Sequence, residues 1–206
     1  FIRSKGSGIN KIIINDVEVE GNTATLKFTS GLVDNLTLKT DDDISITNID
    51  NLVINNSSFD SKKDIIVDNW YNSNFSSNST MYYAKNITFD RTKAIGDDVD
   101  MTDIPDQLIS LFKCELVGSF FAKNLDFIDI SESHFRDVSS LKLDNVTSLS
   151  IASNVWYNDG PIDLSFNKCN LLKTSIAVHN INRKAKFVLT ECTGNLGIRT
   201  LDNTDK

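Results

Sequence analysis

One short pattern recurs along the sequence: two apolar residues flank a polar one, a small or polar residue follows three positions later, and an apolar residue comes two positions after that. Three copies, at residues 49–59, 125–135 and 146–156, agree position by position. Partial copies begin at Ile87, Ile109, Leu164 and Phe187. Alternation over three to five residues is typical of a short strand with one buried face. A chain of such strands must stack them to bury that face.

The copies return at a regular interval. Ile65 and Ile87 are 22 residues apart, and Ile109 follows after another 22. Ile128 and Leu149 are 21 residues apart. A period of this length indicates a solenoid, in which each repeat forms one coil of the stack.

Strands also recur within one period. Alternating segments start at Leu36, Ile44 and Leu52, eight residues apart, so three of them fill a coil of 24 residues. A coil with three faces fits this spacing. Four apolar residues also have apolar counterparts 97 residues later, close to four coils: Ile44, Leu52, Phe59 and Ile65 match Leu141, Leu149, Trp156 and Ile162.

The sequence therefore predicts an all-β fold: a single-stranded parallel β-helix, or β-solenoid, of about eight or nine coils with a period of about 22 residues, in one domain over 1–206. Two stretches break the pattern, the aromatic and Asn/Ser-rich 68–84 and the acidic 93–107, and we expect both to project as loops. Asn suits the tight corners of such coils, because it tolerates left-handed backbone. The candidates are Asn55, Asn56, Asn145, Asn167, Asn170 and Asn180.

Three cysteines occupy the small-residue position of the pattern. Cys114, Cys169 and Cys192 each follow the second apolar residue of a copy by three positions, which predicts equivalent, stacked places. Cys169 and Cys192 are 23 residues apart and should lie on adjacent coils. Two interpretations stay open: a column of small buried thiols, or a disulfide between adjacent coils.

The copies at 49–59, 125–135 and 146–156 resemble right-handed parallel β-helix proteins, the architecture of pectate-lyase-like enzymes and of bacteriophage tailspikes. The copy at 146–156 also resembles the strand-and-asparagine core of leucine-rich repeats. The β-helix is preferred, because most copies lack that asparagine and no helix-length segment recurs. The resemblance implies an extracellular protein that recognises or degrades polysaccharide.

Charge and composition exclude several classes of function. The net charge of −7 and the pI near 4.8 argue against nucleic acid as a partner. Apolar runs are only a few residues long, which excludes membrane insertion by a helix. His134 and His179 lack neighbours at zinc-ligand spacing, and there is no glycine-rich phosphate loop. No cofactor is therefore expected.

The acidic stretch holds the candidate catalytic and metal-binding residues. Gly96-Asp97-Asp98 resembles the paired aspartates of polygalacturonase-like hydrolases, in which one carboxyl group donates a proton and the other activates water. The rest of that family's constellation is missing. Asp98, Asp100 and Asp103 present several oxygens that a Ca²⁺ ion would accept. The alternative is an ordinary solvated loop.

An aromatic cluster supplies the candidate ligand-binding residues. They are Trp70, Tyr71, Phe75, Tyr82 and Tyr83, with Met81 among them. If exposed, these side chains could stack on sugar rings or anchor a partner protein. The alternative is ordinary packing along the side of the coils.

The preferred functional hypothesis is an extracellular, cell-surface or virion-associated recognition and adhesion module that binds a cell-surface glycan or protein. The alternatives are a polysaccharide hydrolase or lyase and a structural shaft or spacer. Because an end coil exposes unpaired strand groups, association into a homo-oligomer is a further expectation. The sequence begins at Phe1 rather than Met, so we expect a piece of a longer chain.

Overall fold

The computed structural model describes residues 2–3, 11–21, 24–28, 30–48, 51–69, 74–90, 108–136, 140–157, 162–179 and 185–201. The regular structure in these ranges consists of β-strands. In chain order they are β1 (Ile2–Arg3), β2 (Lys11–Gly21), β3 (Ala24–Phe28), β4 (Ser30–Thr40), β5 (Ile44–Asn48), β6 (Asn51–Asn55), β7 (Ser58–Ser61), β8 (Asp64–Asn69), β9 (Asn74–Asn78), β10 (Met81–Asp90), β11 (Leu108–Phe112), β12 (Glu115–Ser131), β13 (His134–Arg136), β14 (Ser140–Tyr157), β15 (Ile162–Asn167), β16 (Asn170–His179), β17 (Ala185–Thr190) and β18 (Thr193–Leu201). Within the same ranges, no helix has the length and hydropathy to cross a membrane.

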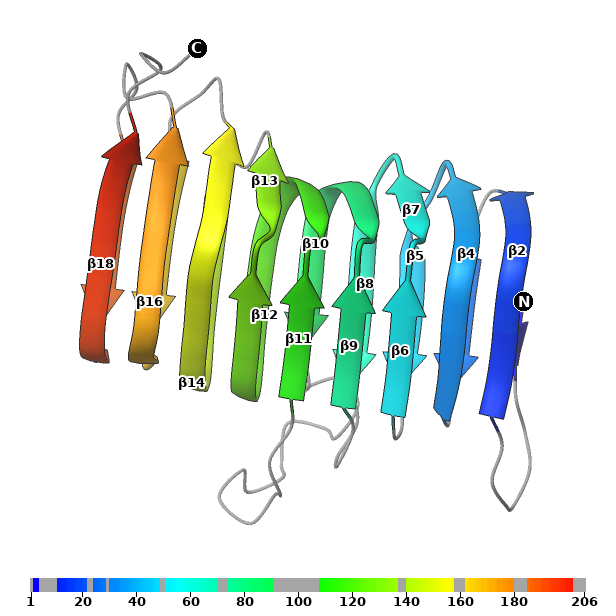
Figure 1. Cartoon of the computed structure of the whole chain (residues 1–206), viewed down its shortest axis with the longest axis horizontal. Coiled ribbons are helices and arrows are strands. Elements are labelled where there is room, and N and C mark those ends of the chain that lie inside the picture. The colour runs from blue at the N-terminus through cyan, green and yellow to red at the C-terminus, as the bar shows by residue number, and fades with distance from the viewer. Residues whose placement is uncertain are drawn as a thin grey trace.

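The described strand pairs are parallel and form three ladders, one on each face of the coils (Figure 1). The first face carries β2, β4, β6, β9, β11, β12, β14, β16 and β18. The second carries β2, β4, β7, β10, β12, β13, β14, β16 and β18. The third carries β1, β3, β5, β8, β10, β12, β14, β15 and β17. The prediction of a parallel β-solenoid with three-faced coils is confirmed.

The coil winds in the right-handed sense. In Figure 1 the first-face strands run upward on the near side, the third-face strands run downward behind them, and the chain advances from β2 to β18, right to left. Nearly all crossovers between parallel strands of one sheet have this hand, because strand twist favours it.

The predicted period of about 22 residues is confirmed, but one of the residues used to derive it, Ile109, is not equivalent to the others. Ile65 pairs with Ile87, 22 residues later. The partner of Ile87 on the next coil, however, is Phe120, and Ile109 pairs instead with Phe75 on the first face. The additional residues 91–107 fall between these coils and lie outside the described residues. Because of this insertion, Ile109 follows Ile87 by 22 residues but lies on the first face, whereas Ile87 lies on the third.

Three of the four matches at 97 residues share a column of the stack. They are Ile44 with Leu141, Leu52 with Leu149, and Phe59 with Trp156. The fourth match is wrong. Leu164, not Ile162, pairs with Leu141 and continues the column of Ile65.

The predicted loop at 68–84 is largely strand, which corrects the sequence analysis. β8 reaches Asn69, and β9 and β10 cover 74–78 and 81–90, leaving 70–73 outside the described residues. Phe75 and Ser77 in β9 are fully buried, in register with Leu52 and Ile54. A serine therefore stands where the pattern has its second apolar residue, and this substitution concealed the strand.

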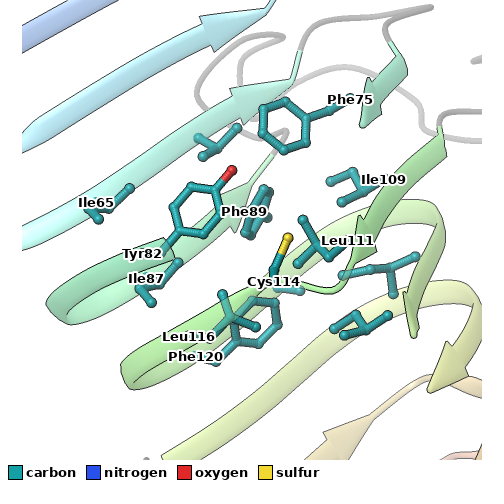
Figure 2. Close-up of a cluster of buried hydrophobic side chains, with 14 of the residues drawn as sticks. Ile65, Phe75, Tyr82, Ile87, Phe89, Ile109, Leu111, Cys114, Leu116 and Phe120 are labelled. Carbon is teal, nitrogen blue, oxygen red and sulfur yellow. The ribbon is translucent and has the colours of Figure 1, made fainter. Parts of the chain in front are cut away.

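The inward-facing side chains form a continuous core between the faces (Figure 2). Its largest members are aromatic residues in contact with one another, both between neighbouring coils and across the interior. The ring centroids are 5.5 Å apart for Phe59 and Tyr82, 5.5 Å for Phe75 and Phe89, 5.8 Å for Phe89 and Phe120, and 6.0 Å for Phe120 and Phe135. Such pairs contribute about 0.5–1.5 kcal/mol each beyond the burial of their area.

Two of the corners use left-handed backbone. Between the first and second faces the residues with positive φ are Asn35, Asn56, Ser79, Lys113 and Glu132, and between the third and first they are Asn124, Asn145, Lys168 and Glu191. The predicted role is thus confirmed for Asn56 and Asn145. Asn55 and Asn167 instead end strands and join side-chain ladders, with Asn78 Nδ2 donating to Asn55 Oδ1 at 2.8 Å. Asn170 begins β16, and Asn180 lies outside the described residues.

The cysteines occupy two different corners, so the prediction of three equivalent places is wrong. The N–H of Cys114 donates to Ser133 Oγ at 3.1 Å, which places Cys114 at the corner between the first and second faces. Cys169 and Cys192 lie at the other corner on adjacent coils, where Thr193 N donates to Cys169 O at 2.9 Å. All three thiols are free, and those of Cys169 and Cys192 donate to backbone carbonyls.

Candidate functional site

The structure describes only part of the candidate site residues. Trp70 and Tyr71 lie outside the described residues. So do the candidate catalytic pair Asp97 and Asp98 and the candidate calcium ligands Asp98, Asp100 and Asp103. In the ranges that are described, no group of three His, Cys, Asp or Glu side chains is placed to hold a metal ion.

Phe75 and Tyr82 are core residues, which corrects their prediction as ligand contacts. Both side chains are fully buried, and Figure 2 shows them pointing into the interior of the coils. The Tyr82 hydroxyl donates to Ser77 Oγ at 2.8 Å, and burial raises the pKa of Tyr82 well above its usual value. Neither ring is accessible to a ligand.

Tyr83 and Met81 lie on the outside of the same strand. Tyr83 is 50% exposed and Met81 is 37% exposed. Residues of a strand point alternately to its two faces, so the buried Tyr82 lies between two outward side chains. Of the predicted aromatic ligand contacts that the structure describes, Tyr83 alone is on the surface.

Tyr83 stands at a place where the corner between the second and third faces becomes shorter from coil to coil. Three residues, 61–63, join Asp60 to Asp64. On the next coil two residues, 84–85, join the positions in register with these, Tyr83 and Asn86. On the coil after that the single residue Gly118 does so. The corner therefore loses one residue on each of these successive coils.

Gly118 is essential to the shortest corner. Its φ is 122°, and a Cβ built on it would lie 1.8 Å from the backbone oxygen of Ala84. That contact is impossible, and the obstacle is backbone rather than a side chain that could move away. The close approach of the two coils at this corner therefore requires glycine at this position.

The residues of these three corners line an open hollow of about 490 Å³, which we call the corner notch. It is lined by Ser61 and Lys62, by residues 83–85, and by residues 117–119. A volume of this size falls within the range of small-molecule sites. Its lining combines small residues, such as Ala84 and Gly118, with the aromatic side chain of Tyr83.

The two lysines of the corner notch differ in their partners. Lys62 Nζ forms an ion pair with Asp41 on the preceding coil, and the hydrogen bond to Asp41 raises the pKa of Lys62. Lys85 is exposed and has no ion-pair partner within the described part of the chain. Ser61 is already engaged, since its hydroxyl donates to Asp42 O at 2.7 Å.

A second arrangement brings two carboxyl groups to adjacent coils. Asp68 in β8 and Asp90 at the end of β10 are in register on the third face, and Asp90 is only 9% exposed. Neighbouring strands lie about 4.8 Å apart, so the two groups are close. The chain continues from Asp90 towards Asp97 and Asp98.

Sequence reasoning identified Tyr83 but missed Lys62, Lys85 and Gly118. The signal that could have identified these three residues was the number of residues between the strands of the second and third faces. That number can be counted only once the register is known, because the corner carries no motif of its own. Gly118 between Val117 and Ser119 is one glycine among nine in the sequence.

No protein-family model, curated protein or solved structure matches this chain. The inferences below therefore depend on the chain's own residues and geometry.

Proposed function

We propose that this solenoid is a recognition or adhesion module, extracellular or carried on a virion, that binds a cell-surface glycan at the corner notch. The observation that carries the proposal is the position of Tyr83, half exposed at the wall of a hollow of about 490 Å³. An aromatic face beside a polar rim suits a sugar ring, which has an apolar face and hydroxyl edges.

The resemblance to pectate-lyase-like enzymes and tailspikes is consistent with this proposal but does not carry it. One solenoid architecture serves many unrelated functions, so the argument depends on the site. Trp70 and Tyr71 remain predicted ligand contacts. They precede β9 in the sequence and are part of the same hypothesis.

The test compares two exposed residues of one strand. Tyr83→Ala removes the aromatic side chain from the lining, whereas Met81→Ala removes an exposed side chain that does not line the notch. On a glycan array, with release of reducing ends assayed on each hit, we expect binding without release. Tyr83→Ala should weaken it about tenfold, which corresponds to about 1.4 kcal/mol, a typical loss for an aromatic contact.

Equal loss in the Met81→Ala variant, or full binding in Tyr83→Ala, would refute the notch as the site. If no glycan binds but a cell-surface protein is captured, the same pair of variants tests whether that protein uses Tyr83. Variants at Trp70 and Tyr71 extend the comparison to the two aromatic residues that precede β9 in the sequence.

The second candidate function is a polysaccharide hydrolase or lyase, and the carboxyl pair of Asp68 and Asp90 favours it. Glycoside hydrolases use two carboxyl groups, one as an acid and one as a base or nucleophile. Asp68→Asn and Asp90→Asn should each abolish release of reducing ends if this pair is catalytic. Asp97→Asn and Asp98→Asn test the acidic stretch in the same assay. Retained release in all four variants would remove both assignments.

The third candidate, a structural shaft, is favoured by the last described coil. There Phe187, Leu189 and Ile198 are 36%, 50% and 43% exposed, whereas Leu164 and Phe166, the equivalents of the first two on the preceding coil, are buried. Light scattering across a concentration series tests whether copies associate. A constant monomer mass would argue against a shaft built from copies of this chain.

A further inference from the structure

We propose that the corner notch selects a negatively charged sugar unit, with the ring against Tyr83 and the carboxylate or sulfate group held by Lys85 and Lys62. This inference deepens the proposed function and rests on it. It specifies the chemical class of the ligand, which the exposure of Tyr83 alone does not.

The lining of the notch has a charge opposite to that of the protein. The sequence holds 28 acidic and 21 basic residues, with a net charge of −7. Among the described residues that line the notch, two are lysines and none is an aspartate or glutamate. On a surface with an excess of carboxylates, a hollow whose charged lining residues are lysines favours anions, although Asp41 lies beside it as the partner of Lys62.

Lys85 is available to a ligand without breaking an existing ion pair. No described acidic side chain forms a salt bridge with it, in contrast to its neighbours Lys62 and Lys63, which pair with Asp41 and Asp42. The N–H of Lys85 donates to Lys63 O at 2.7 Å, which fixes the backbone from which the side chain extends. Because the backbone of Lys85 is held in place, its ammonium group can reach only a limited set of positions.

Lys62 can join Lys85 at small cost. Its ion pair with Asp41 joins side chains that are 70% and 66% exposed. Exposed pairs of this kind contribute little to stability, because water and salt screen them and because both side chains lose freedom. An anionic ligand could therefore share Lys62 with Asp41.

The net negative charge of the protein does not prevent such binding at physiological salt. The Debye length is about 8 Å at 0.15 M, so distant carboxylates are largely screened. Close to the notch, Asp41 and Asp60 act on Lys62, so Lys85 is the main source of the positive potential that a bound ligand meets. A further increase to 0.5 M salt should weaken the binding of a charged ligand and leave that of a neutral ligand nearly unchanged.

The experiment titrates the full chain with matched sugars and follows the amide signals of residues 61–62, 83–85 and 117–119 by NMR. One pair of ligands is N-acetylglucosamine and its 6-sulfate, and the other is glucose and glucuronate. Each pair differs in one charged group, and the two pairs distinguish sulfate from carboxylate. We expect at least one charged member to bind about fivefold more tightly than its neutral counterpart, a modest value typical of exposed charge contacts.

Three lysine variants test the assignment. Lys85→Gln should remove most of the preference for the charged sugar and leave neutral binding unchanged, whereas Lys85→Arg should retain the preference. Lys39→Gln is the matched control, because Lys39 is an exposed lysine of the second face that pairs with Asp60 and does not line the notch.

Two results separate this inference from the proposed function. Equal binding of charged and neutral sugars, with loss of both in Tyr83→Ala, would overturn the charge selection and keep the notch as a glycan site. Absence of any shift in the notch signals with all four sugars would overturn both. Equal weakening of charged and neutral binding by Lys85→Gln would also overturn the charge selection.

Discussion

Replacing Gly118 by alanine tests the corner on which the notch depends. The added Cβ would lie 1.8 Å from Ala84 O, where ordinary contact begins at 3.4 Å, so the two coils would have to move apart by about 1.6 Å. An L-residue held at the φ of 122° costs about 1–3 kcal/mol. Losing one or two ladder hydrogen bonds around the corner adds about 1 kcal/mol each. The expected loss of unfolding free energy is therefore about 2–5 kcal/mol.

Equilibrium unfolding in urea, followed by far-ultraviolet circular dichroism, measures this loss. Gly194→Ala is the matched variant, since Gly194 has a φ of 92° and its Cβ would lie 2.4 Å from Leu171 O. Gly194 is exposed in β18, at the last described coil, where only one described neighbour must adjust. We expect a loss of about 1–3 kcal/mol there. A Gly118→Ala variant within 0.5 kcal/mol of the wild type would refute the close approach of the coils.

Two further predictions concern the core. Tyr82→Phe should lower the free energy of unfolding by about 1–2 kcal/mol, because Ser77 Oγ, in a buried place, loses the Tyr82 hydroxyl and keeps only the weak donor Cys114 Sγ at 3.7 Å. Tyr83→Phe, one residue away on the surface, should change it by less than about 0.5 kcal/mol, and equal effects in urea unfolding would contradict the inward direction of Tyr82. Burial raises the pKa of the Cys169 thiol from its ordinary value near 9 to about 11. Between these pH values the unfolded chain releases the proton and the folded chain retains it, so stability should fall as pH rises. A Cys169→Ala variant should show a smaller fall across this window, and an identical pH profile would contradict the burial of the thiol.

The three-faced coil and most of the core were predictable from the sequence. The copies at 49–59 and 125–135 present apolar residues at the spacing of strands with one buried face, and the structure buries Leu52, Ile54 and Phe59 as this spacing predicts. The strand β9 was missed because Ser77 takes an apolar position. Its hydroxyl is tolerated there because Tyr82 lies opposite, a contact between different strands that no local pattern reveals.

The candidate site was predictable only in part. The sequence singled out Tyr82 and Tyr83 together, since both are aromatic residues in polar surroundings. The alternation of the strand then buried one and exposed the other, and the phase of that alternation depends on register. A shift of one residue exchanges the two faces of a strand.

By itself the sequence determined the solenoid, its period and the corner residues Asn56 and Asn145, because short alternating strands and the tolerance of Asn for left-handed backbone are local properties of the chain. Only the tertiary structure decided which coil lies beside which after residues 91–107, and with it the partner of Ile87. It also decided the corner notch. That hollow is lined by three corners that are distant in sequence, so it exists only when parallel pairing brings Lys62, Lys85 and Gly118 onto consecutive coils.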